Sequence, residues 1–549
     1  MKKIIFLTII FFLPFLSFSQ TTTQVSTKII PASPKLIIGI VIDQMRVDYI
    51  YKYWNKYSND GFRRLVNEGF FCKNTHYNYV PTYTGPGHAS IYTGTTPSYH
   101  GIVSNDWYDR ETNKTIYCSV DNSVEAVGGS VKSGSMSPKN MLSTTFCDQL
   151  KLSNNQQSKV IGIALKDRGA ILPAGHSANA AYWFDAATGD WMTSTFYMKA
   201  LPQWVTDFNK KQTAKNYVSK PWTTLLPIEQ YTESFFDDNI YESVFKGEAK
   251  PVFPHDLPKM AELNGGVGVI RWTPFGNSIT KDFALELIKS ENLGKGKVTD
   301  ILAISFSSTD YVGHAYGPQS IEVEDTYLRL DKDIAEILKF LDTWVGKNNA
   351  FVFLTADHAA VDNPAYLNSI KIPGGYFSAK QPIDSLKKFL TGKYGDSLVL
   401  TYDNQQVYLN RKLIEQKKLN EVEVENSVAT FLLKFKGVAS CVTAHSLQNV
   451  YFASGINSLI QNGFYAKRSG DVAITFEPGW VEYDKTGTTH GSAYNYDTHV
   501  PLIFYGWKIK SGSTLQKVEI TDIAPTICLM LNINLPNACT GKPIEAIIK

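Results

Sequence analysis

Residues 35–43 read KLIIGIVID, an unbroken apolar run that ends at a carboxylate, Asp43. Continuous apolar runs of this length are typical of strands buried on both faces, as in a parallel sheet, whereas half-exposed strands alternate. Four more such runs occur in the chain: residues 159–168 (KVIGIALKDR), 301–310 (ILAISFSSTD), 350–358 (AFVFLTADH) and 500–506 (VPLIFYG). The repetition predicts a parallel sheet containing these five runs.

Helical patterns lie between the predicted strands, for example in residues 325–345 (DTYLRLDKDIAEILKFLDTWV). Alternating strands and helices predict an α/β fold, with a mostly parallel central sheet and helices on both faces. Two stretches depart from this alternation: about residues 171–295 lack regular periodicity, and about residues 375–485 have α and β patterns of their own. We expect both to be insertions or a cap over the sheet. In such sheets ligands bind beyond the carboxyl ends of the strands, which is where most of the runs place polar residues.

The composition is that of a globular protein, with 43% hydrophobic and 19% charged residues in a chain of 549. The formal net charge is only +3 and the basic residues are scattered. This distribution argues against a nucleic-acid-binding protein, which would carry a basic stripe. We therefore expect no nucleic-acid partner. The protein is expected to be a monomer.

The N-terminus has the pattern of an exported protein. Residues 1–20 read MKKIIFLTIIFFLPFLSFSQ, with two lysines, an apolar run and small residues before Gln20. This order is typical of a cleaved secretory signal peptide, and the run is too short and too interrupted by proline for a membrane span. We expect residues 1–19 to be removed and the mature protein, without a membrane span, to be periplasmic or secreted.

Six cysteines remain in the mature chain, and none has CxxC or zinc-finger spacing. A cysteine metal site is therefore not expected. An exported protein can form disulfides, and a local pair such as Cys528–Cys539 is one option, although spacing does not determine the connectivity.

Metal-ligand side chains follow several of the predicted strands. Asp310 and His314 are four residues apart, so a helix starting near Asp310 would put both on one face. Asp357 and His358 are adjacent at another strand end, and His490 lies in a GTTHG loop. With Asp43 these are six oxygen and nitrogen ligands without sulfur, a set that suits two sites for Zn²⁺ or a similar ion.

A hydroxyl group lies in an unusual setting at residues 81–90 (PTYTGPGHAS). Pro86 favours the first turn of a helix, which would put Thr84 near the helix N-terminus, where free N–H groups attract anions. Thr84 could be a plain helix cap. The surrounding glycines, however, would let a ligand approach closely, and a Thr activated by a metal is a good nucleophile for phosphorus.

Taken together, these motifs resemble the alkaline phosphatase superfamily. The resemblance rests on Asp43 and on the segments TYTGPGHASIYTG, HGIVSN, KDR, DYVGH, ADH and GTTHG, which occur in the family's order. It is strongest to the exported, zinc-dependent phosphate monoesterases of the phosphate-irrepressible (PafA) type. It implies an alkaline phosphatase-like catalytic domain over residues 20–549 and small-molecule phosphomonoesters as substrates.

The resemblance also implies roles for individual residues. One zinc ion, on the leaving-group side, would be held by Asp310, His314 and His490. The other would be held by Asp43, Asp357 and His358, together with Thr84 as the nucleophile that forms a phosphothreonine.

Three further residues match groups that contact the phosphoryl oxygens: Asn105, Lys166 and Arg168. A monoester dianion presents several charged oxygens, which an ammonium and a planar guanidinium can neutralise. Lys166 and Arg168 could instead be a solvated strand end.

Other functions remain open from the sequence. A nucleotide pyrophosphatase or phosphodiesterase of the same superfamily would use the same metal ligands and a Thr nucleophile, but an apolar site near the phosphoryl group. A sulfatase would need a modified Cys or Ser in place of Thr84. An inactive phosphate- or metal-binding protein would show a gap among the ligands, and the sequence has none.

Overall fold

The computed structural model describes residues 32–548, so the signal peptide expected at residues 1–19 lies outside the described residues. A ten-stranded mixed sheet forms its centre. The strand order is β20 (Gly512–Thr514), β2 (Phe70–Cys72), β19 (Leu502–Gly506), β11 (Ala350–Thr355), β1 (Leu36–Ile42), β10 (Asp300–Phe306), β7 (Val160–Ala164), β8 (Ala180–Asp185), β9 (Asp190–Ser194) and β6 (Ala126–Val127).

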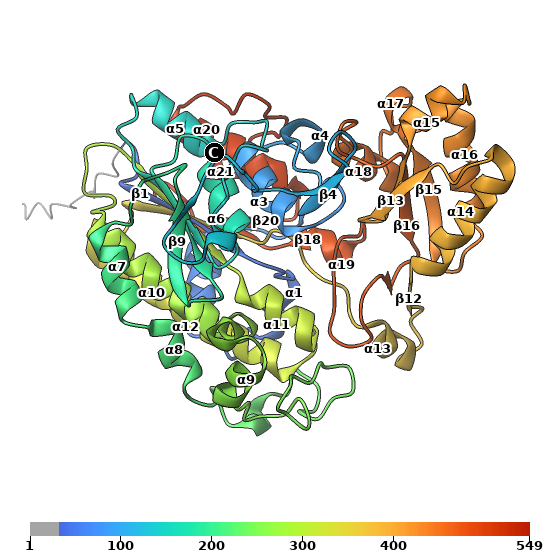
Figure 1. The fold of residues 1–549 in the computed structure, drawn as a ribbon. Coiled ribbons are helices and arrows are strands. Elements are labelled where there is room, and N and C mark those ends of the chain that lie inside the picture. Colours follow the sequence, from blue (N-terminus) through green and yellow to red (C-terminus); the bar gives the residue numbers. More distant parts are fainter. Residues whose placement is uncertain (1–31, 549) are drawn as a thin grey trace, which may run out of the picture.

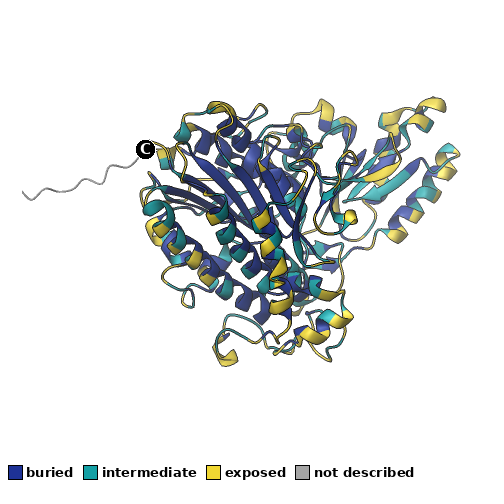
Figure 2. Cartoon of the chain, turned by 60° about the vertical axis from the view of Figure 1, so that its left-hand side comes forward, coloured by how far each residue is buried: buried dark blue, intermediate teal, exposed yellow. Residues whose placement is uncertain are grey.

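Five neighbouring strands at the centre, from β11 through β1, β10 and β7 to β8, are all parallel. Every residue of these strands is buried, and Figure 2 shows them as a dark layer inside the molecule. Burial on both faces explains their continuous apolar runs.

The run at residues 500–506 departs from the prediction. It supplies β19, which pairs antiparallel with β11. The prediction of a parallel strand was wrong here because a continuous apolar run reports burial on both faces and carries no information about direction.

Helices cover both faces of the sheet (Figure 1). On one face lie α3 (Thr84–Thr93), α5 (Phe146–Ser153), α6 (Asp167–Ala174) and α20 (Ile523–Leu531). On the other lie α10 (Phe275–Ser290) and α12 (Ile321–Leu341). The predicted α/β fold, with a central parallel sheet and helices on both faces, is confirmed.

A small subdomain (residues 380–476) stands to one side of this main body (Figure 1). Its antiparallel sheet has the order β13 (Val399–Asp403), β14 (Gln406–Leu409), β16 (Val472–Phe476) and β15 (Val438–Thr443). Helices α14 (Lys380–Tyr394) and α16 (Glu421–Leu432) pack on it around a separate apolar core.

The other predicted insertion, residues 171–295, contributes in part to the main body. It contains β8, β9 and α10, which belong to the central sheet and its helical layer. The remaining segments of this stretch include α9 (Leu257–Leu263) and contribute residues to the main apolar core. The exact boundaries of the insertions stay a prediction.

All six cysteines are free thiols, so the bridge between Cys528 and Cys539 considered from the sequence is not formed. Among the helices of residues 32–548, none combines the length and the apolar composition that crossing a bilayer requires.

Candidate active site

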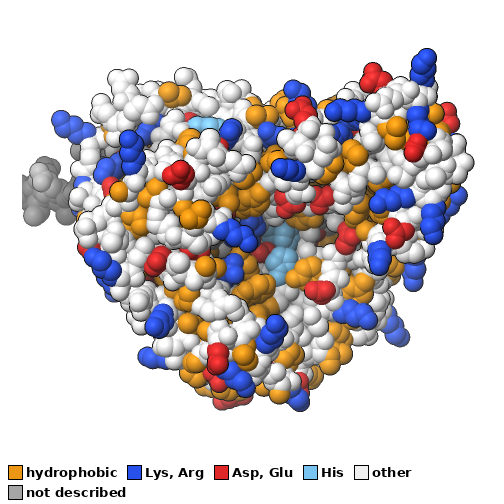
Figure 3. All heavy atoms as spheres, in the orientation of Figure 1, with side chains coloured by type: hydrophobic (Ala, Val, Ile, Leu, Met, Phe, Trp, Pro, Cys, Tyr) orange, Lys and Arg blue, Asp and Glu red, His pale blue; other side chains and the backbone are white. Residues whose placement is uncertain are grey.

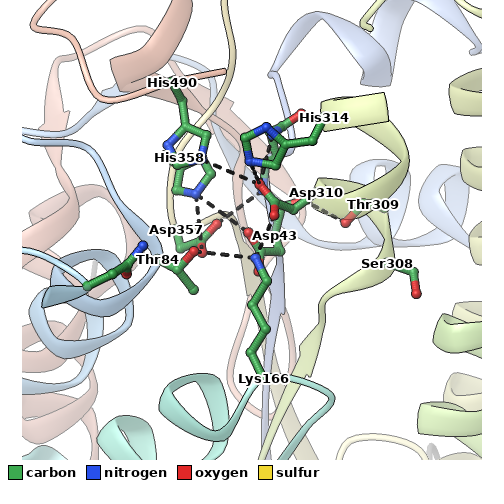
Figure 4. Close-up of polar contacts among 12 residues, drawn as sticks. Asp43, Thr84, Lys166, Ser308, Thr309, Asp310, His314, Asp357, His358 and His490 are labelled. Atoms are coloured by element: carbon green, nitrogen blue, oxygen red, sulfur yellow. Dashed lines mark hydrogen bonds and ion pairs between the residues drawn. The ribbon is translucent and has the colours of Figure 1, made fainter. Parts of the chain in front are cut away.

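The candidate site lies where four parallel strands end. Asp43 follows β1, Lys166 follows β7, and Asp357 with His358 follows β11. The next helix after β10 is α11 (Ser308–Tyr316), which carries Asp310 in its first turn. Because these strands are neighbours running in one direction, their ends bring the side chains together (Figure 4).

Asp310, His314 and His490 form the first cluster of possible metal ligands. Helix α11 places Asp310 and His314 one turn apart on one face, as the spacing predicts. The Nε2 atoms of His314 and His490 lie 3.2 and 3.5 Å from Asp310 Oδ1. His490 comes from the loop before α19 (Asn495–Thr498), about 180 residues away in the chain.

Asp43, Asp357 and His358 form the second cluster. All three are fully buried, and His358 Nε2 lies 3.5 Å from Asp43 Oδ1 and 3.6 Å from Asp357 Oδ2. Burial raises the pKa of Asp43 to about 6, although Lys166 opposes the shift. Burial and the neighbouring Asp43 carboxylate also raise the pKa of Asp357 well above its usual range. A cation beside these two buried carboxylates would favour their charged forms.

Hydrogen bonds to the backbone fix the protonation of the three histidines. Nδ1 of His314, His358 and His490 donates to the carbonyl oxygens of Thr488, Ala359 and Thr82, at 2.7, 3.0 and 2.8 Å. A carbonyl can only accept, so each neutral imidazole carries its proton on Nδ1. The lone pair on each Nε2 therefore faces the cluster, which is the arrangement that metal-binding histidines use.

Several buried polar atoms in the clusters have no hydrogen-bond partner: Asp43 Oδ1, Asp357 Oδ2 and His358 Nε2. Such atoms are rare in folded proteins because an unpaired buried polar group is costly. A divalent cation would satisfy them, and carboxylate and imidazole ligands suit a borderline ion. These unpartnered atoms all belong to the second cluster, which therefore fits a bound divalent metal ion. The first cluster fits one through the carboxylate of Asp310 and the Nε2 lone pairs of His314 and His490.

A third acidic group has a different explanation. Glu421, Glu425 and Asp471 also lie close together, in the small subdomain. Asp471, however, pairs with Arg110 at 2.8 Å and with Arg411 at 2.6 Å. Because arginines already neutralise this carboxylate, the group needs no metal ion.

Thr84 is the first residue of α3, at the helix N-terminus that the sequence predicts. It is not the cap, because the cap position is Tyr83 and no side chain caps the helix. Gly87 is required for packing, since a Cβ there would lie 2.3 Å from the carbonyl oxygen of Asp357. The helix can therefore bring the Thr84 hydroxyl directly against the end of β11. This packing role differs from the ligand approach that the sequence suggests for the glycines.

Lys166 lies between the two clusters and the Thr84 hydroxyl. Its Nζ is 2.6 Å from both Asp43 Oδ2 and Asp310 Oδ2, and it donates to Thr84 Oγ1 at 3.4 Å. Although burial alone would lower its pKa, the two carboxylates raise it above the usual range, so the ammonium stays charged.

Arg168 and Asn105 complete the set that the sequence indicates. Arg168, in the first turn of α6, has its buried Nε without a hydrogen-bond partner. Asn105 Oδ1 accepts from the backbone N–H of Gly85 at 2.8 Å, so its NH₂ is the part of the amide that can donate to a ligand. The structure brings every candidate residue from the sequence to one place.

Two contributors were missed by the sequence reasoning. Gln44 donates from Nε2 to Asp310 Oδ1 at 2.7 Å and from its backbone N–H to Asp357 Oδ1 at 3.1 Å. Tyr117 accepts from Arg168 Nη1 at 3.0 Å and donates to Asp167 Oδ1, which orients the guanidinium. The only signal in the sequence for Gln44 was its position next to Asp43, and no motif marks Tyr117.

The site is open to solvent on one face of the molecule. Figure 3 shows histidine side chains in a hollow at the centre of this face, between the main body and the small subdomain. His314 and His490 are partly exposed, so a small ligand can approach the first cluster from the surface.

Comparisons with known proteins agree with this geometry. The sequence model of the type I phosphodiesterase / nucleotide pyrophosphatase family matches residues 37–500. The chain is 49% identical to a Myroides odoratus protein named calcium-transporting ATPase, over 94% of this chain and 95% of that one. It is 45% identical to alkaline phosphatase PafA of Elizabethkingia meningoseptica, over 94% of each chain.

The fold has a close counterpart among solved structures. A crystal structure of wild type alkaline phosphatase PafA matches with a TM-score of 0.91 and 45% identity. The match covers 94% of this chain and 99% of that one. The likeness thus extends over the central sheet, the candidate site and the small subdomain together.

Proposed function

Since the chain belongs to the type I phosphodiesterase / nucleotide pyrophosphatase family, within the alkaline phosphatase superfamily expected from its sequence, we propose that it is an exported phosphate monoesterase. It forms a phosphothreonine at Thr84 and uses two Zn²⁺ ions. Its substrates are small phosphomonoesters, and its product is inorganic phosphate. Export rests on the N-terminal pattern of residues 1–19.

The positive charge beside Thr84 is the observation that favours a monoester as the substrate. Lys166 Nζ is 3.4 Å from Thr84 Oγ1, and Arg168 follows two residues later. A monoester dianion has one more negative charge than a diester, and its non-bridging oxygens need cationic or N–H partners. A diester would instead place a second organic group beside these two cations, which would desolvate them without neutralising them.

The metal ions would be held by the two clusters. Asp310, His314 and His490 would bind one zinc, and Asp43, Asp357, His358 and Thr84 the other. Bound zinc supplies Lewis-acid stabilisation of charged oxygens.

The chain's own residues supply the remaining steps. Thr84 Oγ attacks phosphorus, a bond forms between them, and the ester P–O bond breaks; the proton lost by the Thr84 hydroxyl is balanced by the one that the departing oxygen takes up to leave as the alcohol. Lys166, Arg168 and the Asn105 amide stabilise the charge on the non-bridging oxygens. Water then attacks the phosphothreonine, which releases phosphate and restores the Thr84 hydroxyl. Two in-line displacements give net retention at phosphorus.

The test compares kcat/KM for an aryl phosphate monoester and the matching methyl aryl diester, with zinc present. We expect the wild type to prefer the monoester, and the Lys166→Ala/Arg168→Ala variant to lose most of that preference. The control is Lys210→Ala/Lys211→Ala, which removes two exposed positive charges at α7 (Gln203–Lys210), away from the site. It should leave the preference unchanged.

A nucleotide pyrophosphatase or phosphodiesterase is the second candidate, because the matched family carries that description. A diester preference that the Lys166/Arg168 double variant does not change would establish it in place of the monoesterase.

A further inference from the structure

A pocket of about 110 Å³ opens beside the candidate active site, between the main body and the small subdomain. The main body contributes Tyr83, His490 and Tyr496 to its lining. The turn between β13 and β14 contributes Asn404 and Gln405 from the small subdomain. One wall of the pocket is therefore the tip of the β13–β14 hairpin, which reaches across to Tyr83, the residue before Thr84.

The pocket is joined to the catalytic geometry through two residues. Tyr83 precedes Thr84, and His490 belongs to the metal cluster with Asp310 and His314. The two rings meet edge to face, with their centroids 5.4 Å apart. Gly491 makes this approach possible, because a Cβ at that position would lie 2.6 Å from the Tyr83 ring.

The position of the pocket indicates which part of a substrate would enter it. In an in-line displacement the leaving oxygen departs opposite the nucleophile. The resemblance to the alkaline phosphatase superfamily implies that the cluster containing His490 lies on the leaving-group side. An organic group on that oxygen would therefore extend past His490 and Tyr83 toward the hairpin tip.

The lining of the pocket has an aromatic and amide character. Tyr83, Phe476 and Trp480 offer ring surfaces, while Asn404, Gln405 and Gln406 offer amide groups. Aromatic walls with a few directional polar groups are typical of pockets for flat organic ligands.

The lining of the pocket contains acidic side chains and, within the described chain, no basic ones from lysine or arginine. Its acidic residues are Glu482 and Asp497. Glu482 Oε2 accepts from Tyr402 OH at 2.8 Å and from Gln405 Nε2 at 3.4 Å. These donors hold the carboxylate at the wall, and Gln405 in turn accepts from Tyr83 OH at 3.4 Å. Figure 3 shows acidic side chains beside the histidines at the hollow.

We propose that this pocket binds the leaving group of the phosphomonoester and selects a neutral or cationic aromatic group over an anionic one, with Glu482 as the residue that sets the charge preference. The inference rests on the proposed function and extends it to a substrate class. Monoesters whose alcohol carries a second phosphate or carboxylate should be poor substrates, because that anion would lie near Glu482.

The experiment uses the zinc-loaded protein and four substrates. These are phenyl, para-aminomethylphenyl and para-carboxyphenyl phosphate, and methyl phosphate, whose leaving group is too small to fill the pocket. We expect kcat/KM to fall from the aminomethyl to the phenyl to the carboxyl compound. Glu482→Gln should reduce the aminomethyl-to-carboxyl ratio by about fivefold, since a charge several ångströms away in a half-buried site contributes on the order of 1 kcal/mol. Glu482→Lys should reverse the preference.

The matched control is Glu415→Gln, which removes an exposed carboxylate in α15 (Arg411–Gln416) of the same subdomain and should leave the ratio unchanged. Inhibition by inorganic phosphate should be the same in all variants, which shows that the metal clusters and Thr84 are intact.

This experiment distinguishes a failure of the leaving-group pocket from a failure of the proposed monoesterase function. An aminomethyl-to-carboxyl ratio near one in the wild type, or a ratio unaffected by Glu482→Lys, would overturn the leaving-group pocket while phosphate release from phenyl and methyl phosphate still upheld the monoesterase. No phosphate release from any of the four monoesters would overturn the proposed function itself.

Discussion

The side-chain amide of Gln44 donates from Nε2 to Oδ1 of Asp310 at 2.7 Å. Because Gln44 directly follows Asp43, this hydrogen bond links the two clusters of possible metal ligands. Gln44 adopts a left-handed backbone conformation with φ of 65°, which is uncommon for a residue other than glycine. Gly313 provides the space, since a Cβ there would lie 2.0 Å from Gln44 Oε1. A residue in a strained backbone conformation that bonds to a possible metal ligand indicates that Gln44 positions Asp310.

Replacing Gln44 should therefore weaken metal binding. We expect Gln44→Ala to lower zinc affinity by about 10- to 100-fold, the usual effect of losing a group that orients a metal ligand. Competition with a chromophoric chelator measures this without any substrate.

Gln319→Ala is the matched control, because Gln319 also donates its amide to an aspartate, Asp362, outside both clusters. Equal zinc affinity in wild type and Gln44→Ala would contradict the positioning role.

Thr84 is expected to carry the covalent step. Thr84→Ala should lower kcat/KM by at least about 10³-fold, because a nucleophile is removed from a set of groups that act together. Thr84→Ser keeps a hydroxyl at the same helix N-terminus and should retain measurable turnover. Rapid-quench labelling should detect a phosphoprotein in wild type and none in Thr84→Ala. A Thr84→Ala protein with full turnover would show that another group attacks phosphorus.

Removing the metal ions should cost both activity and stability. The buried carboxylates of Asp43 and Asp357 lose the cations that offset their repulsion. Free zinc at 100 times its Kd stabilises the folded state by about 2.7 kcal/mol per site. We expect dialysis against a chelator to lower Tm and abolish phosphate release, and zinc to restore both. Full activity in a preparation shown to contain no divalent metal would contradict the two-cluster assignment.

His255 predicts a pH-dependent stability unrelated to catalysis. The buried imidazole lies between two carboxylates, with Nδ1 2.7 Å from Glu248 Oε1 and Nε2 3.1 Å from Glu322 Oε1. Burial alone would lower its pKa, but hydrogen bonds to Glu248 and Glu322 outweigh this and raise the pKa to about 9. Because the folded-state pKa exceeds the unfolded value of 6.5, the stabilisation is complete below about pH 6.5. It is lost as the pH rises through about 9.

The free energy of unfolding should therefore fall by up to about 3 kcal/mol between pH 6.5 and 10 because of this residue. His255→Gln should remove that part of the dependence in urea unfolding at saturating zinc, whereas His445→Gln, at an exposed histidine, should not. An identical pH profile in wild type and His255→Gln would show that His255 is not charged in the folded protein.

Much of the site was predictable because its parts are local in sequence. The ends of β1, β7 and β11 carry Asp43, Lys166 and the Asp357–His358 pair directly, and the helix after β10 follows from the four-residue spacing of Asp310 and His314. Parallel neighbouring strands end at one edge, so locating the strands was enough to bring these side chains together.

The sequence by itself determined the buried central strands and the position of Thr84 at a helix start, and it predicted the types of possible metal ligand, because each depends on residues within one turn or one strand. Only the tertiary structure decided what depends on distant segments. It placed His490 beside Asp310, set β19 antiparallel, fitted Gln44 against Gly313 and brought the Gln405 hairpin tip to Tyr83. Strand direction and contacts between remote loops follow from how whole layers pack, and no short pattern of residues encodes that packing.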